Sequence, residues 1–199
     1  HVNWGNGLID FDSDGDLDIF IANGHTEDNI HLWDTDTAYR APNFLMLNDG
    51  TGHFHNISKT AGSGLTPEKA SRGTAFDYLD NDGDVDAVIL NSREKSTIIR
   101  NDTESANHWL GIRLIGVAAN RDAVGTQVTI QAGNLKRLDE VHSGRSYQSH
   151  FGSRLHFGLG QHTRVDRIQI RWHGGGQQQL ENVAGDQQIT VVQGKQNHD

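Results

Sequence analysis

Residues 10–18, DFDSDGDLD, have the most distinctive chemistry in the chain, because five aspartates stand at alternate positions. Like charges this close repel one another, so the segment needs a counter-charge, and a hard cation supplies one. Ca²⁺ binds about six to eight oxygens, often in a loop with ligands at positions 1, 3, 5, 7 and 9 and a glycine at position 6. Around Gly15, the ligand positions hold Asp10, Asp12, Asp14, Asp16 (through its main-chain carbonyl) and Asp18.

The sequence after this loop excludes an EF-hand. Position 12, where an EF-hand has its bidentate glutamate, is Ile21. The run LDIFIAN that follows is short, apolar and rich in isoleucine, which predicts a strand rather than a helix. Asp18 must therefore close the site from the start of that strand.

A second acidic loop, DYLDNDGDVD at residues 77–86, repeats the design. When Gly83 is aligned with Gly15, the ligand positions hold Asp80, Asp82, Asp84 and Asp86. Position 1 is Tyr78, and the nearest acid, Asp77, lies one residue too early. Either a bulge brings Asp77 in or the site lacks a ligand, so we predict a second, weaker Ca²⁺ site. Such repeats indicate an array of similar structural units.

Composition narrows the functional classes. The chain has 199 residues, a formal charge of −9 and no cysteine, so thiolate metal sites and disulfides are excluded. It shows no basic stripe for nucleic acid and no apolar run near the roughly 20 residues that cross a bilayer. Calcium loops of modest affinity suit the extracellular space, so we expect a secreted or cell-surface protein. The chain begins within a repeat pattern, at His1, which suggests a mature or truncated product.

The chain between and after the loops offers weaker candidates. Residues 24–40 predict a long surface loop, and Asn48-Asp49-Gly50 predicts a hairpin between Phe44 and Ile57. His53 and His55 share one face of its second strand and could bind Zn²⁺, but exposed strand histidines are the commoner case. Ser146 with His142 or His150 and Asp122 could form a catalytic triad, although the sequence has no Gly-x-Ser-x-Gly elbow. Asn56 and Asn101 stand in glycosylation sequons.

Residues 1–104 resemble FG-GAP or VCBS repeats. The resemblance rests on Asp-x-Asp-x-Asp-Gly-Asp-x-Asp, an apolar strand, and then Leu-x-Asn-x-Gly-x-Gly-x-Phe, which matches Leu45 to Phe54 with one residue of slack. It implies blades of an integrin-like β-propeller with Ca²⁺ in the blade loops. The tyrosine at position 78 departs from the pattern.

Residues 105–199 differ in character, because the acidic loops stop and arginine and glutamine become common. Over about residues 107–194 the chain resembles the ASPIC/UnbV domain of proteins similar to the cartilage acidic protein 1 family. The resemblance rests on five segments that follow one another in the family's order: NHWLGIRLIG, NRDAVGTQVTI, SGRSYQSH, RLHFGLG and VDRIQIRW. WHGG at residues 172–175 departs from the family's Trp-Pro-Ser-Gly. Alternation in VTIQA and RIQIRW predicts strands with one buried face, and several glycines, including Gly158 and Gly160, are predicted to mark turns.

The predicted fold is therefore all-β: partial integrin-like β-propeller-type repeat units, followed by an antiparallel β-sandwich-like domain. The predicted function is a non-enzymatic extracellular Ca²⁺-binding module for adhesion or for glycan or protein interaction. One alternative is a self-assembling subunit of a fibre or surface array, since unpaired β edges invite pairing with other chains. Another is a surface polysaccharide hydrolase, which needs two carboxylates about 5–10 Å apart in a cleft.

Overall fold

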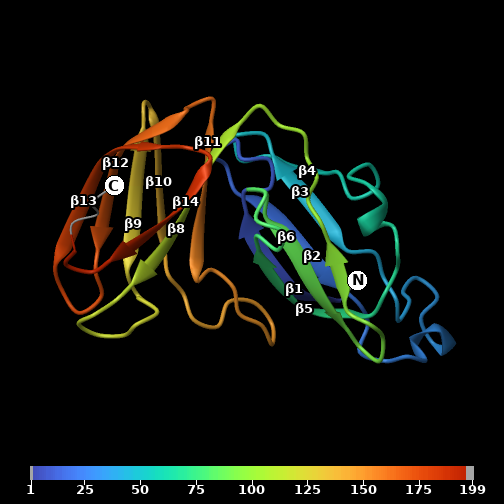
Figure 1. Ribbon diagram of the computed structural model, residues 1–199. Helices are drawn as coiled ribbons and strands as arrows, with labels where there is room; N and C mark the ends of the chain where they lie inside the picture. Colours follow the sequence, from blue (N-terminus) through green and yellow to red (C-terminus); the bar gives the residue numbers. More distant parts are fainter. Residues whose placement is uncertain (1, 196–199) are drawn as a thin grey trace.

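The computed structural model describes residues 2–195 and is all-β, as predicted. Figure 1 shows two bodies of strands side by side, an N-terminal half and a C-terminal half. The helices among the described residues are two short 3₁₀ turns, η1 (Ile30–Leu32) and η2 (Ser63–Leu65). No helix in this part of the chain has the length and apolar composition needed to cross a lipid bilayer.

The N-terminal half consists of two antiparallel sheets, with strand orders β1-β2-β3-β4 and β5-β6-β7. The strands are β1 (Asn3–Ile9), β2 (Asp18–Asn23), β3 (Phe44–Asn48), β4 (Phe54–Asn56), β5 (Ser71–Asp77), β6 (Asp86–Asn91) and β7 (Thr97–Ile99). Strands β3 and β4 form the predicted hairpin. Within residues 2–195, these sheets close into neither a barrel nor a ring of blades.

The two N-terminal sheets repeat one design along the chain. Ser71 follows Asn3 by 68 residues, and Asp86 follows Asp18 by the same 68, so β5 and β6 repeat β1 and β2. In both pairs the register also shifts near the start of the first strand, between Asn3 and Asn6 in β1 and between Ser71 and Thr74 in β5. The acidic loops therefore occupy equivalent places, each joining the first two strands of its sheet.

An aromatic cluster fills the space between these two sheets. The Phe76 ring lies 5.9 Å from Phe11 and 5.5 Å from Phe20, measured between ring centroids, with edge-to-face geometry. Phe151 of the C-terminal half packs against the same Phe76 ring at 4.9 Å. Such aromatic pairs add favourable energy beyond the area that they bury. The core of the first half is thus completed by a residue of the second half.

The C-terminal half is a sandwich of two sheets, ordered β10-β9-β12-β13 and β11-β8-β14. The strands are β8 (His108–Ile115), β9 (Gln127–Ala132), β10 (Leu135–Glu140), β11 (Arg154–Gly160), β12 (Arg164–Arg171), β13 (Gln177–Ala184) and β14 (Gln187–Val192). The antiparallel prediction is wrong for one pair, since β14 runs parallel to β8. The chain crosses between sheets after Ala184, so no hairpin fixes the direction of β14 relative to β8.

Alternating side chains build the core of this sandwich, as the sequence predicted. Val128 and Ile130 of β9 face the same interior as Ile168 and Ile170 of β12, and all four are almost fully buried. Leu110 of β8 meets them from the other sheet. Two sheets that bury one face each in this way are the usual construction of a β-sandwich.

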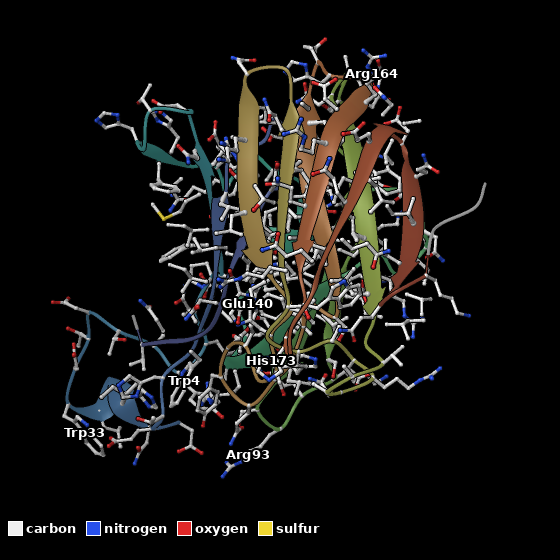
Figure 2. All side chains as sticks on the ribbon, turned by 90° about the vertical axis from the view of Figure 1, so that its left-hand side faces the viewer. Trp4, Trp33, Arg93, Glu140, Arg164 and His173 are labelled. Carbon is white, nitrogen blue, oxygen red and sulfur yellow. The ribbon has the colours of Figure 1, made fainter. Side chains whose placement is uncertain are left out.

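A long surface loop joins β2 to β3, as predicted for residues 24–40. Figure 2 shows Trp33 on this loop, projecting away from the sheets, and the residue is 62% exposed. The loop carries the η1 turn, and the η2 turn lies between β4 and β5.

Candidate metal centre

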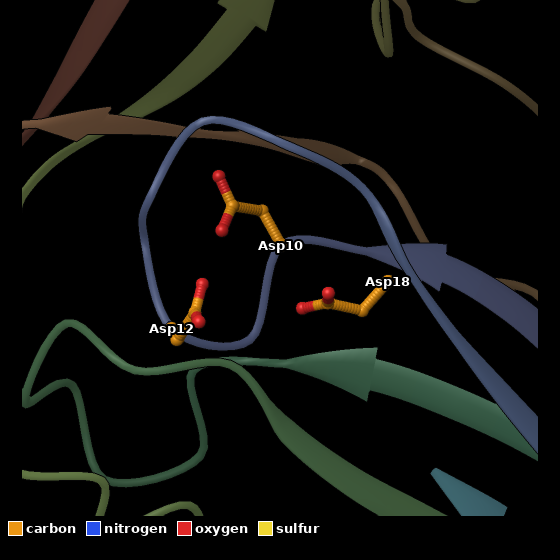
Figure 3. A group of neighbouring side chains, drawn as sticks. All are labelled: Asp10, Asp12 and Asp18. Carbon is orange, nitrogen blue, oxygen red and sulfur yellow. The ribbon is translucent and has the colours of Figure 1, made fainter. Parts of the chain in front are cut away.

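The first acidic loop lies between two paired strands. Ile9 at the end of β1 is the register partner of Asp18 at the start of β2, so residues 10–17 leave and return at one point. Figure 3 shows Asp10, Asp12 and Asp18 pointing toward the inside of this loop. Their three carboxylates each offer an oxygen, and these oxygens lie within 4.8 Å of one another. In the described residues, this is the only group of at least three acidic, histidine or cysteine side chains so close together.

Hydrogen bonds from backbone N–H groups fix two of these carboxylates. Asp18 accepts from the backbone N–H of Phe11 and of Asn48, each at 2.9 Å. The Oδ2 atom of Asp10 accepts from the Gly15 N–H at 2.9 Å. Asp10 and Asp18 are only 4% and 1% exposed, so water does not replace these donors. The loop is therefore a rigid frame around its carboxylates.

One oxygen of this frame has no partner. The Oδ1 atom of Asp10 is buried and makes no hydrogen bond. A buried, unsatisfied carboxylate oxygen is energetically costly, and a cation between Asp10, Asp12 and Asp18 would satisfy it. The side chains present thus fit a hard, oxygen-binding cation such as Ca²⁺.

The remaining predicted ligands shape the turn of the loop. Asp12 and Asp14 accept from the backbone N–H groups two residues ahead, at 3.3 and 2.8 Å. Ser13 and Gly15 adopt positive φ angles of 58° and 97°, which turn the chain sharply. The Asp16 carboxylate is held by Arg137 at 2.6 Å. This leaves the main-chain carbonyl oxygen of Asp16 as the metal ligand expected at position 7.

Electrostatics favour a cation at this place. Burial, followed by the charge of Asp14, raises the pKa of Asp10 to about 8. Burial also raises the pKa of Asp18 to about 6, although two backbone hydrogen bonds oppose the shift. A raised carboxyl pKa means that the folded protein disfavours the ionised form. A bound divalent cation would supply the positive charge that stabilises the ionised form.

The second acidic loop has the same backbone framework. Asp86 accepts from the N–H groups of Leu79 and Asn101, each at 2.8 Å, as Asp18 does from Phe11 and Asn48. The backbone N–H groups of Asp82 and Asp84 donate to the carboxylates of Asp80 and Asp82, at 3.3 and 3.0 Å. Burial, and to a lesser extent the negative charge of Asp82, raises the pKa of Asp84 to about 6. The two loops therefore share these backbone hydrogen bonds.

Position 1 of the second loop differs. Tyr78 is buried there, and its hydroxyl lies 2.5 Å from Nδ1 of His156 in the C-terminal half. The carboxylate of Asp77 is engaged by Arg154 at 2.8 Å and accepts from the Tyr78 N–H. The carboxylate of Asp80 lies 3.9 Å from the guanidinium of Arg100. The structure thus does not gather Asp77, Asp80, Asp82, Asp84 and Asp86 as it gathers Asp10, Asp12 and Asp18.

The weaker candidates are not brought together. Ser146 Oγ accepts from the Asn6 N–H, and no hydrogen bond in residues 2–195 joins it to His142, His150 or Asp122. His53 and His55 are exposed and lie beside Thr51 and Asp49. The two sequons differ, because Asn56 is exposed whereas the Asn101 amide donates to the Phe11 carbonyl at 2.8 Å. Neither a triad nor a histidine metal site is formed by these residues.

Several residues that support the first loop were missed in the sequence. Arg137 and His156 come from the C-terminal half, more than a hundred residues away, and no local pattern marks them. Gly158 was predicted to lie in a turn, but it lies inside strand β11. A glycine within a strand often marks a close approach of another backbone, and that signal could have identified it.

Comparison with known proteins supports one half of the chain. Residues 116–198 match the family model described as ASPIC and UnbV. This range includes most of residues 107–194, where the sequence resembles that domain, and it contains strands β9 to β14 of the sandwich. No curated protein matches the chain. The C-terminal half is therefore similar to the ASPIC and UnbV family.

Proposed function

We propose that the chain is a non-enzymatic, extracellular Ca²⁺-binding module in which the cation stabilises the first acidic loop. The observation that carries the proposal is the buried Asp10 carboxylate, whose Oδ1 atom has no hydrogen-bond partner and which offers an oxygen within 4.8 Å of oxygens of Asp12 and Asp18. Bound Ca²⁺ would supply positive charge and accept these oxygens as ligands. The chain's part is to hold the carboxylates in place through the N–H groups of Gly15, Phe11 and Asn48.

The donor set supports calcium over other common metals. Zn²⁺ sites usually include nitrogen or sulfur ligands, whereas the three gathered side chains are all aspartates. Mg²⁺ requires a near-ideal octahedron, while Ca²⁺ accepts irregular sets of carboxylate and carbonyl oxygens. The Asp16 carbonyl and Asp14 complete such a set in the order expected for the loop. A site of this kind suits a compartment rich in calcium.

The repeated sheets support the finer assignment of residues 1–104 as FG-GAP or VCBS-like, propeller-type units. The same strand pair, register shift and acidic loop recur after 68 residues, as Asp18 and Asp86 illustrate. We assign the second loop a weaker Ca²⁺ site, because Tyr78 replaces the position-1 carboxylate. Its oxygen is turned to His156 rather than to the aspartates.

Calorimetric titration with Ca²⁺ tests this assignment directly. We expect one tight site and one at least about tenfold weaker, in line with the loss of a charged ligand. Asp12→Asn should remove the tight site, whereas Asp80→Asn, at the equivalent position, should affect only the weak one. Equal effects of the two substitutions would contradict the assignment. Failure of the unaltered protein to bind Ca²⁺ would refute the proposed function.

The C-terminal half offers a surface for the proposed glycan or protein ligand. A groove of about 970 Å³ lies along strands β13 and β14, and its walls include Gln177, Gln179, Gln187 and the apolar Leu180. Amide groups donate and accept hydrogen bonds without net charge, which suits neutral hydroxyl or peptide groups. A ligand bound there should slow hydrogen exchange of β13 amides. Slowing confined to other strands would place the ligand elsewhere.

A further inference from the structure

The C-terminal half forms one wall of the first acidic loop. The Gly160 N–H at the end of β11 donates to the Ser13 carbonyl at 2.9 Å. His156 of the same strand is partly buried, and its Nε2 lies 3.5 Å from Ser13 Oγ. Strand β11 thus contacts the loop at two points, next to a proposed ligand.

Gly158 brings β11 into contact with the ligand itself. A Cβ atom at this position would collide with Oδ2 of Asp10 and would lie 2.7 Å from Ser13 Cα. Gly158 is not among the residues with positive φ, so its backbone conformation is open to other residues. Glycine is therefore required at this position because only a residue without a side chain allows β11 to approach Asp10 so closely.

Strand β10 holds the opposite part of the loop. The Arg137 guanidinium donates to the Gly15 carbonyl and, at 2.6 Å, to the Asp16 carboxylate. Gly15 is also the residue whose N–H fixes Asp10. The position of the turn, and with it the hydrogen bond to Asp10, depends on a contact between the two halves.

The second loop also docks on the C-terminal half, but through different contacts. Trp109 packs against Gly83, so that a Cβ there would meet its indole ring. Arg154 binds Asp77 and the Tyr78 carbonyl, at 2.8 and 3.2 Å. The position equivalent to Asp10 is taken by Tyr78, which is not a carboxylate. Only in the first loop does a carboxylate at position 1 face the interface.

We propose that docking of the two halves and cation binding by the first loop are one linked equilibrium, with Gly158 as the positioning residue that sets Asp10. The proposal rests on the proposed function, because it takes Ca²⁺ as the ligand of Asp10, Asp12 and Asp18. Linkage is reciprocal: if docking strengthens cation binding, the cation strengthens docking by the same factor. The ASPIC and UnbV-like half therefore acts as part of the calcium site without supplying a ligand.

Calorimetric Ca²⁺ titration of Gly158→Ala tests one direction of this linkage. We expect the tight site to weaken by about tenfold or more, within the usual range of coupling between sites. The matched control is Gly185→Ala, where a Cβ lies 3.2 Å from the Thr163 carbonyl and meets only the C-terminal half. That variant should bind within about twofold of the unaltered protein, since it leaves the interface intact. Equal affinities of the two variants would overturn the proposal.

Hydrogen exchange tests the other direction in the unaltered chain, whether or not Gly158→Ala folds. Ca²⁺ should slow exchange of the Gly160 amide, which donates across the interface to Ser13, and should not do so in Asp12→Asn. Tight Ca²⁺ binding that leaves Gly160 exchange unchanged would overturn the linkage but keep the proposed function. Absence of any Ca²⁺ binding would overturn both.

Discussion

Chelation of Ca²⁺ by EGTA is expected to lower the melting temperature of the protein by about 5–16 °C. A ligand present at about 100 to 1,000 times its dissociation constant adds roughly 2.7–4.1 kcal/mol of stability. For a chain of this size, about 1 kcal/mol corresponds to roughly 2–4 °C. The physical source is the buried Asp10 carboxylate, whose Oδ1 has no partner in the protein. Thermal unfolding followed by circular dichroism, in Ca²⁺ and in EGTA, measures the shift.

The Asp10→Asn variant should reverse the order of stability between the two conditions. Its amide keeps an oxygen for the Gly15 N–H and removes the buried negative charge, so in EGTA it should melt above the unaltered protein. In Ca²⁺ the variant should gain little stability, so it should melt at a lower temperature than the unaltered protein. Asp166→Asn is the control, since this partly exposed aspartate lies on β12, outside both acidic loops, and its response to Ca²⁺ should be normal. A normal Ca²⁺ response of Asp10→Asn would contradict the role given to Asp10.

The sequence predicted the acidic loop well because its chemistry is local. Five aspartates and Gly15 lie within nine residues, and the loop geometry follows from backbone turns and hydrogen bonds of short range, such as that from Asp16 N–H to Asp14. The strand after it was equally clear from the run of isoleucine and phenylalanine. The structure is all-β, and it brings together three of the five aspartates predicted as ligands, namely Asp10, Asp12 and Asp18.

The surroundings of the loop could not be predicted, because they depend on contacts between distant segments. Nothing near His156 indicates that it approaches Tyr78, 78 residues earlier, or that Arg137 reaches Asp16. The direction of β14 was missed for a related reason, since the chain crosses between sheets instead of turning in a hairpin. Gly158 was assigned to a turn because glycine is common in turns, whereas here it allows two backbones to touch.

Asp18→Ala and its counterpart Asp86→Ala give the most direct comparison of the two loops. Both side chains are 1% exposed, and each accepts two backbone hydrogen bonds of 2.8–2.9 Å. Removing such an acceptor leaves two N–H groups without a partner, at about 1–3 kcal/mol each. In EGTA, urea unfolding should therefore show similar losses of about 2–6 kcal/mol for both variants.

In Ca²⁺, the two variants should separate. Asp18→Ala also loses the cation's contribution of roughly 3–4 kcal/mol, whereas Asp86→Ala keeps the tight site and loses much less. Asp18→Asn and Asp86→Asn retain one acceptor oxygen, so they carry the comparison if the alanine variants do not fold. Equal losses in Ca²⁺ would mean that Tyr78 is no handicap to the second loop. A larger loss of stability for Asp86→Ala would place the tight site in the second loop. The two aspartates accept equivalent hydrogen bonds, so a difference in stability between the two variants in Ca²⁺ measures the contribution of the bound ion.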